Sequence, residues 1–285
     1  MKRHWLAIVT LLVIAALWGA TFSLIKDVLT RIAPEPFIAW RFTIAGLVLI
    51  AAAAQRRALS RPLLRPGIIL GVLVFAGYWM QTRGLLFISP SRSAFVTGLY
   101  VVMVPFTDAI VYRTRIPLRA WTSSVVAVIG FAAMAGGFDA RPTWGDFLTF
   151  GCAVLFAFHV VFSARFSAEH SPVGLAAVQV LFVGLAAIPP AAFAPRPAMS
   201  TGVVAVILFT AIVTTALAFA ALMWGQAHVT ATEAAVILSF EPVAASITSI
   251  GWYGEPVTAS FVIGAALILA AMTLSQLGAS ATMPD

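Results

Sequence analysis

The chain has 285 residues, of which 61% are hydrophobic and only 9% are charged, and its mean hydropathy is +1.02. A water-soluble globule of this length cannot bury so much apolar surface, so the composition predicts an integral membrane protein. The single cysteine, Cys152, excludes an intramolecular disulfide, and the four histidines lack metal-ligand spacing, so no metal site is expected.

A membrane-spanning helix needs about 20 consecutive apolar residues. The first such run follows a basic N-terminus, but it has full spanning length and no convincing cleavage site follows it, so we expect a retained helix rather than a signal peptide. The predicted fold is therefore an all-α integral membrane protein with ten transmembrane helices. These cover residues 5–26, 36–54, 67–88, 94–112, 119–137, 146–165, 173–193, 202–225, 233–252 and 257–277.

Lysine and arginine in short loops set the orientation of such a protein, because they are retained on the cytoplasmic side. With a cytoplasmic N-terminus, ten basic residues fall on that side and five on the other. The ten are Lys2, Arg3, Arg56, Arg57, Arg61, Arg65, Arg113, Arg115, Arg119 and Arg165, and the five are Lys26, Arg31, Arg92, Arg141 and Arg196. We expect both termini in the cytoplasm, and the net charge of +7 then reflects topology rather than a nucleic-acid partner.

The chain also repeats itself at a shift of 138 residues, which places Pro34 on Pro172 and the pair Gly46-Leu47 on Gly184-Leu185. The predicted repeats are residues 1–138 and 139–285, with five helices each. An odd number of helices makes the second repeat enter the membrane upside down. Two inverted five-helix repeats are a common construction of secondary transporters.

Four motifs then carry a resemblance: "WGATF" in the first helix, "AEHSPVGLAAVQ" leading into the seventh, "EAAVILSFEPVAASI" on the ninth and "GEPVT" before the tenth. In order and spacing they resemble the drug/metabolite transporter superfamily, in particular its EamA group, over essentially the whole chain. One departure is Arg115 in "RTRIPLR", where many members carry glutamate. The resemblance implies a transporter of small metabolites, with the YddG-type amino-acid exporters as the functional model.

Polar and aromatic residues recur at mid-depth on several predicted helices. Helical spacing puts Tyr78, Gln81 and Thr82 on one face, and Thr97 and Tyr100 on another. A buried tyrosine hydroxyl needs a partner, so these faces are expected to meet protein or a watery cavity rather than lipid. Helix packing by the aromatic rings is the open alternative. The predicted substrate-binding set is Trp18, Thr21, Tyr78, Gln81, Thr82, Thr97, Tyr100, Phe158, His159 and Glu241.

Glu241 lies near the middle of the predicted ninth helix. A charge there costs about 2.5–3.5 kcal/mol on insertion scales, so such residues face the bundle interior and mark a pathway. We expect Glu241 to point into a central cavity near Val104 and Pro105, with Pro105 and Pro242 marking the same bend in the two repeats. The open alternative is a protonated Glu241 that bonds a neighbouring helix.

The remaining membrane charges bear on the substrate. Both lysines lie at the ends of the first helix, and Arg41 and Arg83 are expected to reach the outer surface along their helices. Phosphorylated substrates need several fixed cations, so they are not expected. A small zwitterion fits a nearly neutral cavity, with helix amide dipoles for its carboxylate and a carboxyl or hydroxyls for its ammonium.

The leading hypothesis is a secondary transporter in the cell membrane, a bacterial inner membrane, that exports amino acids with neutral or aromatic side chains by alternating access. The alternative is a proton-coupled exporter of drugs or cations in which Glu241 is the coupling group. A membrane enzyme is disfavoured, because no nucleophile, base and orienting group share one depth. No nucleotide-binding motif occurs and no cofactor is expected, so the partners are a small-molecule substrate and the lipid bilayer. The sequence leaves open whether the protein is a monomer or a dimer.

Overall fold

A computed structural model of the chain describes residues 2–113, 115–134, 142–196, 198–226, 228–229, 234 and 237–276. Within these ranges the protein is all helical, without a strand. The helices are α1 (Lys2–Val28), α2 (Pro34–Gln55), η1 (Arg61–Leu63), α3 (Leu64–Gly84), α4 (Pro90–Gly98), α5 (Tyr100–Tyr112), α6 (Leu118–Met134), α7 (Trp144–Glu169), α8 (Pro172–Ala192), α9 (Thr201–Ala211), the π-helix η2 (Ile212–Leu217), α10 (Ala218–Gln226), α12 (Glu241–Tyr253) and α13 (Ala259–Gln276).

Seven helical segments of the described chain are long and apolar enough to cross a membrane. They correspond to the predicted helices one to four and six to eight, and two shorter apolar helices match the fifth and tenth. The all-helical fold predicted from the sequence is thus confirmed for the described residues, whereas the count of ten spans stays a prediction. The predicted ninth helix, 233–252, lies partly outside the described residues.

Besides the partly described ninth helix, two of the predicted helices are irregular in the structure. The span 94–112 is divided at Leu99, where α4 ends and α5 begins. The span 202–225 is continuous, but it changes from α to π geometry over η2. Such π segments are rare and occur frequently at functional sites. Both irregularities lie in the middle of their spans.

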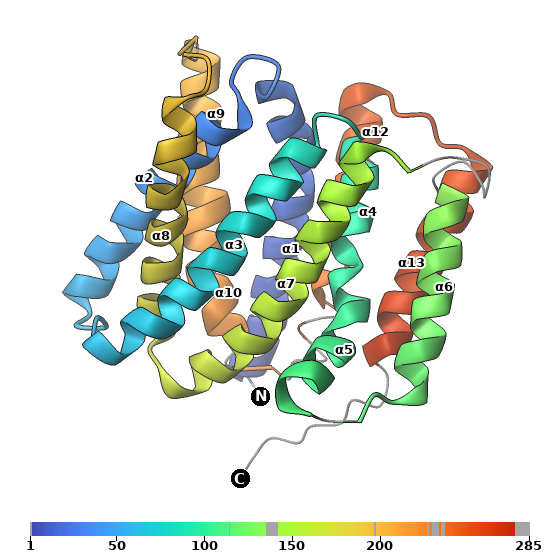
Figure 1. The fold of residues 1–285 in the computed structure, drawn as a ribbon, viewed down its shortest axis with the longest axis horizontal. Coiled ribbons are helices and arrows are strands. Elements are labelled where there is room, and N and C mark those ends of the chain that lie inside the picture. The colour runs from blue at the N-terminus through green and yellow to red at the C-terminus, as the bar shows by residue number, and fades with distance from the viewer. Residues whose placement is uncertain are drawn as a thin grey trace.

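The helices pack mainly across the two predicted repeats (Figure 1). α2 packs most extensively on α8, α3 on α7 and α8, α1 on α12, and α6 on α13 at one edge of the molecule. The α2–α8 contact depends on glycine: a Cβ at Gly46 would lie 2.5 Å from the Cα of Leu181. Close approach through small residues is the usual way in which membrane helices associate, because burial against lipid-like neighbours supplies little driving force.

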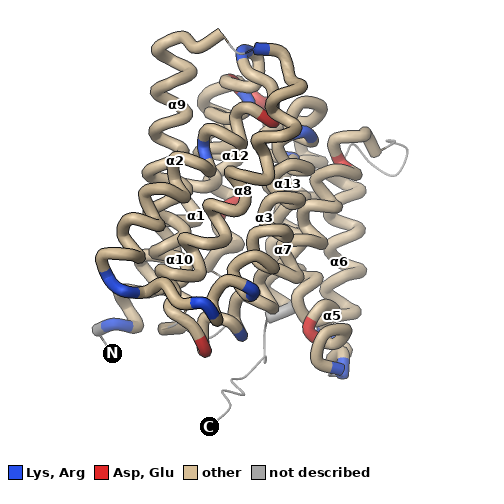
Figure 2. Tube along the Cα trace, turned by 60° about the vertical axis from the view of Figure 1, so that its left-hand side comes forward, with Lys and Arg blue, Asp and Glu red and all other residues tan. Residues whose placement is uncertain are grey.

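Charged residues gather at the two ends of the bundle and leave the middle nearly uncharged (Figure 2). At the end opposite the N-terminus, Glu35 at the start of α2 pairs with Arg83 of α3 at 2.6 Å. At the same end Arg92 of α4 makes two bonds to Asp146 of α7, at 2.7 and 2.8 Å. The uncharged band is the part of the bundle that suits a lipid environment.

We expect Asp146→Ala to destabilise the protein by about 1.5–3 kcal/mol. The substitution removes two charge-assisted hydrogen bonds from Arg92, and it removes the carboxylate that accepts from the backbone N–H of Thr143 at the start of α7. The matched control is Glu169→Ala, which breaks an exposed pair with Arg165 at 3.7 Å that contributes about 0.3–0.5 kcal/mol. Thermal unfolding of the purified variants measures the difference. Equal melting temperatures for the two variants would contradict the role of Asp146.

Candidate functional site: a central polar-aromatic cavity

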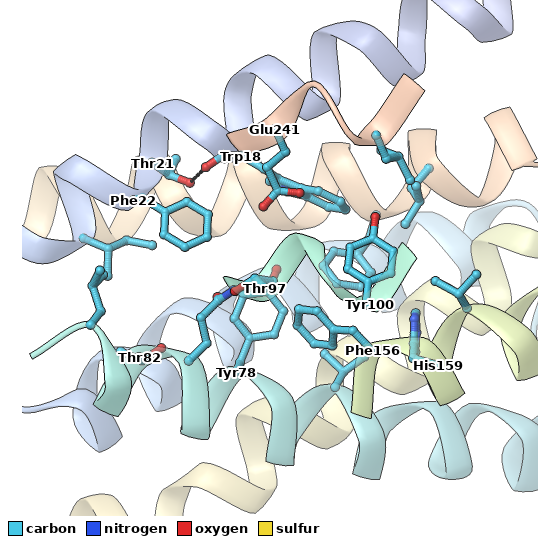
Figure 3. A pocket seen from close by; sticks show the side chains of 18 of the residues that line it. Trp18, Thr21, Phe22, Tyr78, Thr82, Thr97, Tyr100, Phe156, His159 and Glu241 are labelled. Atoms are coloured by element: carbon cyan, nitrogen blue, oxygen red, sulfur yellow. Dashed lines mark hydrogen bonds between the residues drawn. The ribbon is translucent and has the colours of Figure 1, made fainter. Parts of the chain in front are cut away.

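A cavity of about 80 Å³ lies in the middle of the bundle, lined by α1, α2, α3, α4, α5, α7, α10 and α12. Figure 3 shows side chains from different helices, among them Trp18, Tyr100 and Glu241, converging on this space. One water molecule needs roughly 10–15 Å³, so the cavity has room for several waters or for a small polar ligand. It is smaller than the roughly 300–1,000 Å³ of pockets that enclose drug-sized ligands.

Hydrogen bonds between helices hold parts of the polar lining in place. Gln81 of α3 donates from Nε2 to the Thr97 hydroxyl of α4 at 3.0 Å. His159 Nε2 lies 2.8 Å from Oε1 of Gln179, so α7 and α8 are joined beside the cavity. Buried polar groups that are satisfied in this way fix the positions of the side chains around a ligand.

Aromatic rings form the apolar part of the wall. Tyr78 of α3 packs edge-on against Phe42 at 4.9 Å and against Phe156 of α7 at 5.5 Å between ring centroids. Phe156 in turn contacts Tyr100 of α5 at 6.5 Å. Edge-to-face contacts at these distances are favourable and orient the rings.

Glu241 lines the cavity, but it is the first residue of α12 after a turn at 239–240, so the prediction that it lies in the middle of one continuous helix is wrong. Figure 3 shows its carboxyl group directed into the space beside Trp18. Its backbone is held against α1, because Gly19 approaches so closely that a Cβ there would collide with the Glu241 carbonyl oxygen and lie 2.7 Å from the amide nitrogen of Ala245. No hydrogen bond joins the carboxyl to another described residue, so it faces the cavity without a fixed partner from the described chain.

Arg41 of α2 also lines the cavity and is only 2% exposed. Its Nε donates to the Thr215 hydroxyl at 2.7 Å and its Nη2 to the Thr214 hydroxyl at 3.4 Å. The expectation that Arg41 reaches the outer surface is therefore wrong. Its Cα lies seven residues from the start of α2, about 10 Å along the axis, and its guanidinium lies against η2 and the rings of Phe42 and Tyr78.

The π-helix η2 is the partner of two cavity residues. Besides the two hydroxyls that bond Arg41, the backbone carbonyl of Thr214 accepts the indole N–H of Trp18 at 2.8 Å. π geometry shifts the hydrogen-bond register of a helix and frees backbone groups for such contacts. η2 thus orients one residue of α1 and one of α2.

Nine of the ten residues in the predicted substrate-binding set line this one cavity: Trp18, Thr21, Tyr78, Gln81, Thr82, Thr97, Tyr100, His159 and Glu241. Phe158 does not, and its ring stacks on Phe162 at 6.5 Å. On α7 the cavity face holds Phe156, His159 and Val160 instead. These positions share one face of the helix, and Phe158, one residue before His159, points in a different direction. That these residues bind substrate stays a prediction.

The two prolines predicted as bends occupy different settings. Pro242 follows the turn at 239–240 and opens α12 beside Glu241, whereas Pro105 lies inside α5, after the break at Leu99. From this part of the chain Thr97 and Tyr100 line the cavity, and Val104 and Pro105 are not among the described lining residues. The hinge role of both prolines stays a prediction.

Sequence reasoning missed Arg41, Phe156 and the threonine pair of η2. An arginine inside an apolar span is itself a signal of a functional site. The adjacent threonines in "IVTTAL" are a second signal, because hydroxyls in the membrane seek a partner. Neither signal says which helices meet.

Comparison with known proteins agrees with this architecture. The model of the EamA-like transporter family matches the chain twice, over residues 5–136 and 143–276. An uncharacterized transporter of Archaeoglobus fulgidus is 30% identical over 270 residues, covering 94% of this chain and 84% of that protein. The uncharacterized transporter YyaM of Bacillus subtilis is 25% identical over 284 residues, covering 94% and 92%.

A solved protein structure superposes with a TM-score of 0.71 over 95% of this chain and 98% of that one, at 19% identity, which supports the fold alone. The two family matches cover nearly the whole chain, and both relatives are named as transporters. The chain therefore belongs to the EamA-like transporter family, and it is a multi-pass membrane protein that transports small molecules.

Proposed function

We propose that the protein exports amino acids with neutral or aromatic side chains by alternating access through the central cavity. The observation that carries the proposal is the cavity itself, which combines aromatic walls with hydroxyls, an amide, Arg41 and Glu241. Aromatic walls suit an apolar side chain, and the polar groups suit the charged head of an amino acid.

Alternating access requires that two halves move around a shared site. The proposed halves are residues 1–138 and 139–285, as inverted repeats of five spans each, with both termini in the cytoplasm of a bacterial inner membrane. The packing supports this arrangement, because the pairs α2–α8 and α6–α13 each join helices at corresponding positions of the two halves. The cavity is lined from both halves, so a relative motion of the halves changes its access.

A proton-coupled exporter of drugs or cations is the second candidate, and Glu241 in the cavity favours it. Arg41 opposes it, because a buried cation in the same cavity repels a cationic drug. A cation flux that responds to a pH gradient would select this candidate, and a flux that ignores the gradient would reject it.

The transport test uses the purified protein in liposomes preloaded with unlabelled amino acid. We expect exchange uptake of several labelled neutral amino acids above that of protein-free liposomes. Cells that express the protein should also release preloaded amino acid faster than cells with an empty vector, which tests the direction. If none of the twenty amino acids is transported, the proposal fails.

A further inference from the structure

The cavity contains a buried cation whose described partners are all neutral. The Arg41 guanidinium bonds the hydroxyls of Thr214 and Thr215, and its carbon lies 5.2 and 5.3 Å from the ring centroids of Phe42 and Tyr78. Among the described residues no carboxylate forms an ion pair with Arg41. Arg83, near the end of α3, differs in that it pairs with Glu35 and its side chain is 45% exposed.

Neutral partners do not neutralise a buried charge. Hydrogen bonds to the hydroxyls and contacts with the rings orient the guanidinium and offset part of its desolvation free energy. A neighbouring anion offsets this desolvation penalty best. A guanidinium has five N–H donors in a planar fork that matches a carboxylate. The two threonine bonds occupy part of that fork, so donors remain for a ligand in the cavity.

The opposite charge lies in the same cavity but on another helix. Glu241 on α12 and Arg41 on α2 both line the space, and they do not form an ion pair with each other. Ring contacts run from Arg41 through Tyr78 and Phe156 to Tyr100, which lines the cavity together with Glu241. A separated cation and acid on aromatic walls are complementary to a ligand that carries both charges.

We propose that Arg41 binds the substrate carboxylate while Glu241 binds its ammonium, so that the cavity selects zwitterions over amines and over simple acids. This inference rests on the proposed function, in that the bound zwitterion is the transported amino acid. It replaces helix dipoles with a specific side chain as the carboxylate site. η2 positions the guanidinium, because Thr215 accepts from Nε and Thr214 accepts one hydrogen bond from Nη2, and the remaining N–H groups of the fork stay available to a ligand.

The experiment measures binding to the purified protein by thermal shift or calorimetry with three probes of one carbon skeleton. L-leucine carries both charges, 3-methylbutylamine lacks the carboxylate and 4-methylpentanoate lacks the ammonium. We expect wild-type protein to bind L-leucine most tightly. Arg41→Gln should weaken L-leucine and 4-methylpentanoate by about ten- to hundredfold and leave the amine unchanged or improved.

Two further variants separate binding from folding. Arg41→Lys keeps the charge but loses the fork, and Thr215→Val keeps the guanidinium but loses the bond to Nε, so both should weaken L-leucine less than Arg41→Gln does. Arg83→Gln is the matched control, because it removes an arginine that lies outside the cavity lining, and it should bind L-leucine like the wild type. If Arg41→Gln does not fold, Arg41→Lys and Thr215→Val test the inference instead. Both variants should then bind L-leucine with less preference over 3-methylbutylamine than the wild type does.

Wild-type protein that binds the amine as tightly as L-leucine, or Arg41 variants with unchanged affinity for L-leucine, would overturn the inference. The transport assay keeps the two proposals apart. Amino-acid transport that Arg41→Gln leaves intact removes the inference and preserves the proposed function. Carboxylate binding that depends on Arg41, without transport of any amino acid, preserves the carboxylate site and removes the proposed function.

Discussion

Glu241→Gln should lower amino-acid transport by about ten- to hundredfold while the variant inserts and folds like the wild type. Glutamine keeps the size and the hydrogen-bonding capacity of a neutral acid, but it removes the negative charge that the cavity offers to an ammonium. A hydrogen bond to a charged group contributes about 1.5–3 kcal/mol, which sets the expected loss. The measurement is exchange uptake in liposomes that contain equal amounts of correctly folded protein.

The matched control is Glu169→Gln at the exposed end of α7, where the side chain is 58% accessible and lies outside the cavity. It should transport like the wild type. Full transport by Glu241→Gln at every pH tested would mean that the acid is structural. That result would return the alternative in which a protonated Glu241 serves only helix packing.

Gly46→Val should destabilise the protein, lowering the free energy of unfolding by about 1–3 kcal/mol and the apparent melting temperature by about 2–12 °C. A side chain at Gly46 meets the backbone of Leu181 on α8, at 2.5 Å from its Cα and 2.8 Å from its amide nitrogen. Backbone atoms cannot rotate away, so α2 and α8 must separate. Because this is the most extensive helix pair, the separation affects the contact between the two proposed halves.

Gly251→Val is the control for the intrinsic cost of valine in a membrane helix, because nothing lies within 4 Å of a Cβ at Gly251. Thermal unfolding of both variants in the same detergent measures the difference. Equal melting temperatures would show that the α2–α8 contact tolerates a side chain, and that the close approach at Gly46 contributes little to stability.

The site could be predicted in part because helical geometry is local. Tyr78, Gln81 and Thr82 lie on one face of α3 by their spacing alone, and the structure places all three on the cavity. Glu241 is a comparable case, since an acid in an apolar span is costly wherever it faces lipid. Both inferences need only the chain and the membrane.

Helical spacing alone does not predict which face of α7 lines the cavity. Phe156 and Phe158 are the same residue type two positions apart, and only Phe156 lines the cavity. A membrane helix is apolar toward lipid and toward its neighbours, so its sequence carries little amphipathic signal for its rotation. Packing of α7 against α3, α4 and α5 determines which of the two rings faces the cavity.

The burial of Arg41 against η2 is a second feature that the sequence alone does not predict. The sequence determines that an arginine enters the bilayer, because the apolar run around it is long enough to insert. Whether that arginine reaches the surface or stays buried depends on the threonines of η2, which lie more than a hundred residues away in the chain. Hydrophobicity along the chain thus determined which segments form membrane helices. The tertiary structure alone decided which faces meet, because lipid and protein interior are similarly apolar and only close packing and polar contacts distinguish them.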